Sequence, residues 1–312
     1  MSAELRYPAK ATSRGRPRNP VAHDPRPRHD GTLVRNPPCA AAPARAPGEA
    51  VFQLYARIAW YGFRRYSAYR AAALAGAFTN TIFGILRAYV LIALWQARPG
   101  LAGYDVTDAV TFCFLTQAFI GPMQLFGGGL GMAERIRSGD AAIDLLRPAS
   151  LQGWLLADDL GRALYLFLLR SIPPTIVGAL LFGVVFPSSA AVWAAFAVSM
   201  LLGIVVSFGL RYLVDLSACW ILDDRGTAQV SLVLSLFFSG MVVPLNIMPG
   251  WLGTAANALP WAAMVQVPAD VYLGKITVAD ALTFQAGWAA VILALGAVVT
   301  RAARRKVVIQ GG

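Results

Sequence analysis

Six stretches of about twenty mostly apolar residues constrain the fold of this chain more than any other feature, because a membrane-crossing helix needs about that length. Apolar residues make up 57% of the 312 and charged residues 14%, which is too little charge to cover a soluble core of this size. We therefore predict an all-α polytopic membrane protein. Its transmembrane helices are expected at residues 72–95, 109–131, 164–186, 191–213, 229–248 and 279–300, and the fourth could run on towards Trp220.

Residues 1–50 differ from the rest, since they alternate arginine, proline and alanine without apolar periodicity. This composition predicts a disordered basic tail, separate from a transmembrane domain over residues 51–312. A basic arm that contacts anionic lipid is the functional alternative. A further hypothesis is that the start site is over-called and that the native protein begins near Val51.

Residues 51–70 show the pattern of a helix at a membrane surface. Apolar and aromatic side chains recur every three or four positions, while Arg57 and Arg64 fall on another face. Trp60 and Tyr61 suit a headgroup boundary. We predict an interfacial helix before the first span, with a plain cytoplasmic amphipathic helix as the alternative.

The positive charges predict the orientation, because cytoplasmic loops of membrane proteins carry an excess of lysine and arginine. One set of connections and the C-terminus hold most of them: Arg135, Arg137, Arg147, Arg162, Arg211, Arg225, Arg301, Arg304, Arg305 and Lys306. The opposite connections hold Arg98 and Lys275. We expect a multi-pass protein of a bacterial cell membrane with both termini in the cytoplasm. The net charge of +11 is thus explained by membrane anchoring, and no nucleic-acid partner is expected.

The membrane domain offers little for catalysis. Both histidines lie in the tail, and the chain has no phosphate-binding G-x-x-x-x-G-K-[ST] run. Asp215, Asp223 and Asp224 cluster near one predicted loop, but no histidine or further ligand accompanies them, so we interpret them as a solvated loop end. We expect no enzyme activity, no metal and no cofactor. A lipid-modifying enzyme that uses Asp223 and Asp224 is the weaker alternative.

Two stretches of the sequence form recognisable motifs. They are ERIRSGDAAIDLLRP at residues 134–148, after the second span, and FSGMVVPLNIMPGWL at residues 238–252, at the end of the fifth. Together they resemble the permease subunits of ABC-2-type transporters. The resemblance covers the chain from about Val51 onward. It implies a six-span exporter subunit that pairs with a second permease, identical or homologous, and with cytoplasmic P-loop ATPase subunits that bind the ATP.

The resemblance assigns the contact with the ATPase to the first stretch, through Asp140, Asp144, Leu146, Arg147 and Pro148. The residue types agree, because an aspartate after Gly139 can cap a short helix and a proline disfavours helical geometry before it. Mixed apolar and charged side chains suit a groove on a partner protein. A loop anchored by leucines at the membrane surface is the alternative.

The second stretch predicts short re-entrant helices on the outer side, between spans five and six. Pro244 and Pro249 interrupt helix, and Trp251 suits an interface. These helices either gate substrate exit or cap the bundle.

Arg87 is the deepest predicted charge, and it could contact an anionic substrate in the translocation path. Pairing inside the bundle, or reaching for the interface, is the other interpretation. The competing function for the whole chain is a secondary carrier or channel that needs no ATPase. Such a carrier usually has ionisable residues deep in the membrane and often shows inverted repeats. The sequence indicates Arg87 as the only deep ionisable residue, no buried acid for proton coupling and no obvious repeat.

Overall fold

A computed structural model describes residues 47–126, 128–138, 150–221 and 225–310, and every regular element in these ranges is helical. Five of the helical stretches are long and apolar enough to cross a membrane. They are α2 (Arg70–Ala97), α3 (Val106–Met123), the stretch Leu151–Phe182, α8 (Ala190–Ser217) and Val278–Arg305 within α12 (Val278–Gln310). The prediction of an all-α polytopic membrane protein is confirmed.

The fifth predicted span, residues 229–248, corresponds to a shorter helix. It is α9 (Arg225–Phe238), whose 14 residues fall below the roughly 20 that a crossing needs. The helix ends before Gly240, whose φ of 86° is a conformation that few residues other than glycine adopt. The structure thus describes five candidate spans, and the count of six stays a prediction.

The third span begins earlier than the sequence indicated. We expected it at residue 164, but α6 (Leu151–Leu166) starts where the Ser150 hydroxyl accepts a hydrogen bond from the Gly153 amide at 3.2 Å. It continues through a π-helical turn, η2 (Phe167–Ser171), into α7 (Ile172–Phe182). A π turn is a common way to accommodate irregularity in a long helix, and here it precedes Pro173 and Pro174, which cannot donate backbone hydrogen bonds. The assignment of Arg162 to a loop was therefore wrong.

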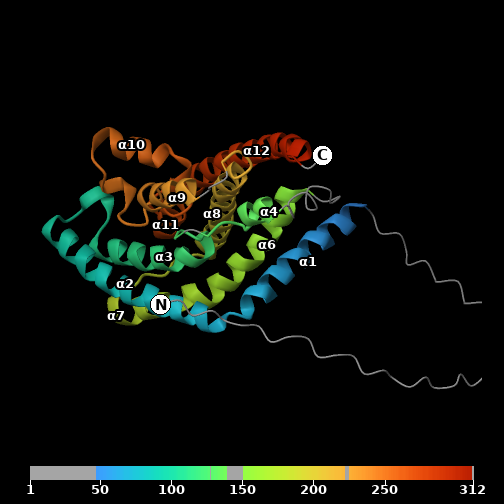
Figure 1. Cartoon of the computed structure of the whole chain (residues 1–312). Coiled ribbons are helices and arrows are strands. Elements are labelled where there is room, and N and C mark those ends of the chain that lie inside the picture. Colours follow the sequence, from blue (N-terminus) through green and yellow to red (C-terminus); the bar gives the residue numbers. More distant parts are fainter. Residues whose placement is uncertain (1–46, 127, 139–149, 222–224, 311–312) are drawn as a thin grey trace, which may run out of the picture. The chain divides into compact units, whose positions relative to one another are not determined.

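The predicted interfacial helix is α1 (Pro47–Ser67), and it packs along α6 (Figure 1). Two glycines allow the backbones to approach. A Cβ on Gly161 would lie 1.8 Å from the Ala59 carbonyl oxygen, and one on Gly62 would lie 2.5 Å from that of Asp158. Arg65 adds an ion pair to Asp158, with Nη2 and Oδ2 2.6 Å apart. The helix is therefore fixed to the third span, and its position at a membrane surface stays a prediction.

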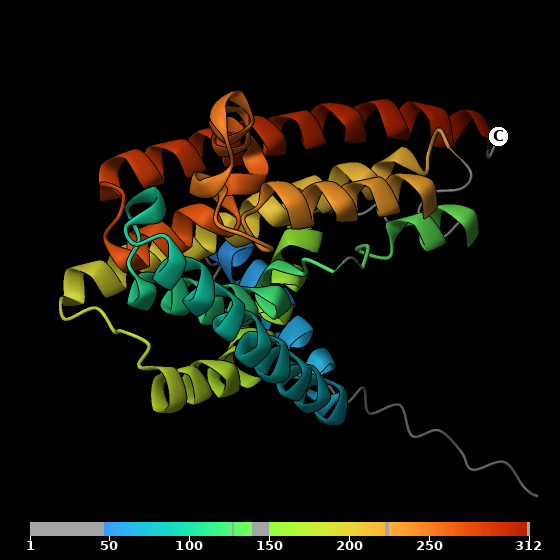
Figure 2. The same cartoon turned by 90° about the vertical axis from the view of Figure 1, so that its left-hand side faces the viewer.

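The centre of the described core is α3, whose residues from Ala109 to Met123 are all buried. It contacts α2, α6, α7 and α8. On its other side α8 packs against α12, and the two helices run in a similar direction in Figure 2. Gly209 of α8 lies in this contact, since a Cβ there would meet the Ile292 side chain at 2.4 Å.

Short helices fill the connection between α9 and α12, as predicted. They are η3 (Leu245–Ile247), α10 (Gly250–Ala258), η4 (Pro260–Ala263) and α11 (Gln266–Leu273). Gln285 of α12 holds them to α8, because its amide nitrogen donates to the Ser199 and Ala263 carbonyls at 3.0 and 2.8 Å. That these helices re-enter the membrane stays a prediction.

Candidate functional site

The five residues assigned to ATPase contact lie outside the described residues. These are Asp140, Asp144, Leu146, Arg147 and Pro148, all within residues 139–149. The structure does describe both ends of this segment. It follows the short helix α4 (Met132–Ser138) and it precedes Ser150, the N-cap of α6.

The start of α4 is held by an aspartate of α8. Asp215 Oδ2 accepts hydrogen bonds from the backbone N–H groups of Leu130 and Met132, at 2.8 and 3.1 Å. The first N–H groups of a helix have no partner within the helix, so a carboxylate here satisfies donors that would otherwise be lost. Gly129 permits the approach, since a Cβ there would lie 2.6 Å from Asp215 Oδ1.

Asp215 corrects our interpretation of the acidic cluster. Its side chain is buried, with 4% of the residue exposed, because α8 continues to Ser217 rather than ending near residue 213. It is therefore no part of a solvated loop end. Asp223 and Asp224 lie outside the described residues.

A second buried carboxylate joins α6 to α8. Asp159 is 3% exposed and lies between two arginines: Arg162 Nε is 2.7 Å from Oδ1, and Arg211 Nη2 is 2.6 Å from Oδ2. A buried charge is costly unless it is paired and hydrogen-bonded. Here the carboxylate and both guanidinium groups each have an oppositely charged partner within hydrogen-bond distance.

The same arginines bind the end of α3. Arg162 donates to the carbonyls of Gly121 and Pro122 at 3.0 and 2.9 Å, and Arg211 donates to Gln124 Oε1 at 3.1 Å. The last carbonyls of a helix lack partners within it and favour a nearby cation. We call Gln124, Asp159, Arg162 and Arg211 the polar network.

The polar network connects three spanning helices, and α8 links it to the segment that was assigned to coupling. Arg211 and Asp215 lie one turn apart on α8, so one helix contacts both the network and the start of α4. A displacement of α4 would therefore act on α8 directly.

Sequence reasoning missed Asp159 as a buried charge. The signal was present, because Asp159 and Arg162 stand three residues apart in a mostly apolar stretch, a spacing that places both side chains on one helix face. Because we had assigned Asp159 and Arg162 to a loop, we did not use this spacing.

Arg87 is paired inside the bundle. Its Nη1 donates to Thr116 Oγ1 of α3 at 3.0 Å, and its Nη2 donates to the Val242 carbonyl at 2.9 Å. It thus joins α2 and α3 to the segment after α9. Of the two interpretations of this arginine, pairing is the one that the contacts match.

The other residues predicted for a gate lie on the same connection but do not converge. Pro244 and Pro249 precede η3 and α10 as their N-caps, so both interrupt helix as expected. Trp251 is 80% exposed on α10. Arg87 binds the carbonyl of Val242, two residues before Pro244, whereas Trp251 is exposed on the surface.

The expectation of no buried acid was wrong, since Asp270 of α11 is buried as well as Asp159. Its carboxylate accepts hydrogen bonds from the Tyr104 hydroxyl and from Gln266 Nε2, the latter at 2.9 Å. Burial raises the pKa of Asp270, and these hydrogen bonds oppose the shift only in part. In the described part of the chain, no three His, Cys, Asp or Glu side chains gather to form a metal site.

Comparison with known proteins agrees with this architecture. The family model described as ABC-2 family transporter protein matches residues 81–311, well over half of the chain. A search of the curated proteins gave no match. The resemblance inferred from the two motifs is confirmed, and this chain belongs to the ABC-2 transporter family as a membrane permease of an ABC transporter.

Proposed function

We propose that this chain is one permease half of an ATP-driven exporter, which forms a translocation path with a second permease and is driven by separate cytoplasmic ATPase subunits. The observation that carries this is the connection from α4 through Asp215 to α8, from α8 to α6 through Arg211 and Asp159, and from both helices to the end of α3 through Arg162 and Arg211. A partner that binds residues 139–149 would pull on α4. The buried contacts of Asp215, Asp159 and Arg162 would then transmit the force to three spanning helices.

The positions of the basic residues support a cytoplasmic location for this end of the bundle. Tyr212, three residues before Asp215, lies 2.6 Å from Thr300 of α12, so the end of α12 is near the end of α8. Arginines in the C-terminal part of α12 and in α4 therefore lie at the same end: Arg135, Arg301, Arg304 and Arg305. Their accumulation favours the cytoplasmic side.

Purification of the intact chain from its native membranes in mild detergent tests the proposal. A P-loop ATPase should co-purify in near-stoichiometric amount, as identified by mass spectrometry. Arg147→Glu should remove most of it, because it reverses a charge in the proposed contact. Arg98→Glu is the control. It makes the same charge change at the C-terminal end of α2, on the other side of the bundle from the proposed contact, and should leave the ATPase bound.

Two results would contradict this function. Absence of any ATPase, from a preparation that is monodisperse by size exclusion, would favour a carrier or channel. Equal loss in both variants would mean that residues 139–149 are not the contact. A second permease-like chain in the same fraction would identify a heterodimer, and its absence together with a dimeric mass would identify a homodimer.

A further inference from the structure

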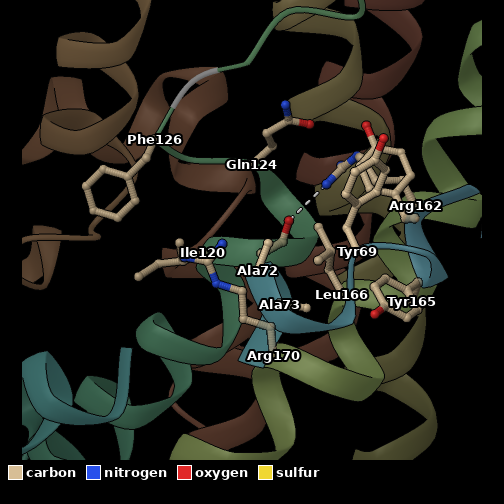
Figure 3. Close-up of a pocket in the computed structure, with 12 residues that line it drawn as sticks. Tyr69, Ala72, Ala73, Ile120, Gln124, Phe126, Arg162, Tyr165, Leu166 and Arg170 are labelled. Carbon is tan, nitrogen blue, oxygen red and sulfur yellow. Dashed lines mark hydrogen bonds between the residues drawn. The ribbon is translucent and has the colours of Figure 1, made fainter. Parts of the chain in front are cut away.

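A pocket of about 330 Å³ lies where the α1–α2 junction, the end of α3 and the α6–η2 stretch meet (Figure 3). Ligand pockets in proteins are commonly of about this size or larger, roughly 300–1,000 Å³. Its lining combines basic, aromatic and apolar side chains and contains no acid: Tyr66, Tyr69, Ala72, Ala73, Ile120, Gly121, Gln124, Phe126, Arg162, Tyr165, Leu166 and Arg170.

The two arginines of this pocket differ in how they are used. Arg162 is fully engaged by Asp159 and by the end of α3. Arg170 makes one hydrogen bond, from Nη2 to Asn80 Oδ1 at 3.3 Å. Within the described residues no carboxylate lies at ion-pair distance from it, so its charge is not compensated.

The position of Arg170 is built into the neighbouring helices. A Cβ on Gly76 of α2 would lie 2.8 Å from its Cζ and Nε, and a Cβ on Gly121 of α3 would lie 3.2 Å from its Cδ. Two glycines therefore make room for the side chain on both sides. The π turn η2, on which Arg170 lies, is a feature that is frequently found at functional sites.

Two buried donors at this pocket lack acceptors in the described structure. They are Arg170 Nε and the Tyr165 hydroxyl. Buried polar groups are normally hydrogen-bonded, and each exception calls for an explanation such as a ligand. Arg170 itself lines the pocket, and an anionic group bound there would compensate its charge.

We propose that this pocket binds the phosphate group of an anionic amphiphile. Arginine is the residue best suited to phosphate, because its planar donors match the oxygens in pairs. Tyr66 and Tyr69 have the amphipathic rings that favour a headgroup boundary, and Ile120, Leu166 and Phe126 offer apolar surface to the adjoining acyl region. The binding needs no partner ATPase, so its failure would leave the proposed function standing.

Lipid titration of the purified full chain, followed by native mass spectrometry, tests this binding. The probes are phosphatidylglycerol and phosphatidylcholine with the same acyl chains. The wild-type chain should retain phosphatidylglycerol preferentially. Arg170→Gln, which removes the charge and keeps much of the size, should weaken that retention about tenfold or more, as expected for loss of a charge-assisted contact.

Arg70→Gln is the matched control, since Arg70 lies at the same end of α2, is exposed and does not line the pocket. It should leave the preference unchanged. Gly76→Ala gives a second test, because the added methyl would displace the Arg170 guanidinium without removing a charge. It should weaken retention as well.

Competition with glycerol 1-phosphate identifies the source of the phosphate. Displacement of phosphatidylglycerol would mean that the phosphate group suffices, and resistance would mean that the acyl region also contributes; both results support a phosphate site. Equal retention of the two lipids by the wild-type chain, or equal losses in Arg170→Gln and Arg70→Gln, would overturn it.

Discussion

Arg211 and Asp159 form a buried ion pair, with Nη2 of the arginine 2.6 Å from Oδ2 of the aspartate, and this contact joins α8 to α6 inside the bundle. Asp159 also binds Arg162 on its own helix. Because the arginines reach the end of α3 as well, this carboxylate holds three helices at the end of the bundle from which α4 begins.

Asp159→Asn should destabilise the protein strongly. The substitution leaves two buried arginines without a counter-charge, and removal of one partner from a buried pair typically costs about 3–5 kcal/mol. Thermal unfolding in detergent measures the change. Asp158→Asn is the control at the next position, where the partner Arg65 is exposed, and its cost should stay near or below about 1 kcal/mol. Similar shifts for both variants would contradict the role of Asp159.

Asp215→Leu should loosen the start of α4 while the spanning helices stay folded. The amides of Leu130 and Met132 lose their acceptor, which costs about 1–3 kcal/mol of local stability. Hydrogen exchange with mass spectrometry should show exchange in this segment accelerated by about tenfold or more. Asp215→Asn keeps an acceptor oxygen and should exchange more slowly than the leucine variant. Unchanged exchange would mean that the cap contributes little.

Gly161→Ala should separate α1 from α6, since its Cβ would lie 1.8 Å from the Ala59 carbonyl oxygen. Overpacking of this kind costs typically about 1–3 kcal/mol. Limited proteolysis near Ser67 and the thermal midpoint are the measurements. Gly226→Ala in α9 is the matched control, because no atom lies within 4 Å of its added Cβ, and it should be neutral or stabilising by up to about 1 kcal/mol.

Asp270 should make stability depend on pH. Its pKa is raised in the folded state, chiefly by burial, so folding favours the protonated acid. The stabilisation is complete below the ordinary pKa of an aspartate and is lost as pH rises through the raised value. The thermal midpoint should therefore fall across that range in the wild type. Asp270→Asn imitates the neutral acid and should reduce this dependence, whereas an unchanged profile would assign it to other groups.

Asp270 also separates the two functions considered for the chain. A proton-coupled carrier would need a deep acid that titrates during transport. An ATP-driven permease does not, so Asp270→Asn should preserve ATPase association in the co-purification assay. Loss of transport without loss of the ATPase would reopen the carrier interpretation.

Much of the architecture followed from apolar segment length alone. A helix is the simplest way for a spanning segment to satisfy its backbone in lipid, so long apolar runs predicted α2, α3, α8 and α12. The surface pattern of residues 51–70 likewise predicted α1. Two motifs were enough to identify the family, because their order and position depend on the sequence only.

Tertiary contacts decided the rest, because they change the environment of residues whose types suggest something else. By residue type alone, Asp159 and Arg162 suggest a loop. In the structure Arg211 of another helix pairs with Asp159, so α6 can continue through both residues. Asp215 resembles a solvated acid until α4 presents its amides. In each case a partner that is distant in the sequence stabilises the buried charge. The sequence by itself determined that this protein crosses a membrane as helices, whereas only the packing of those helices determined which charges are buried between them.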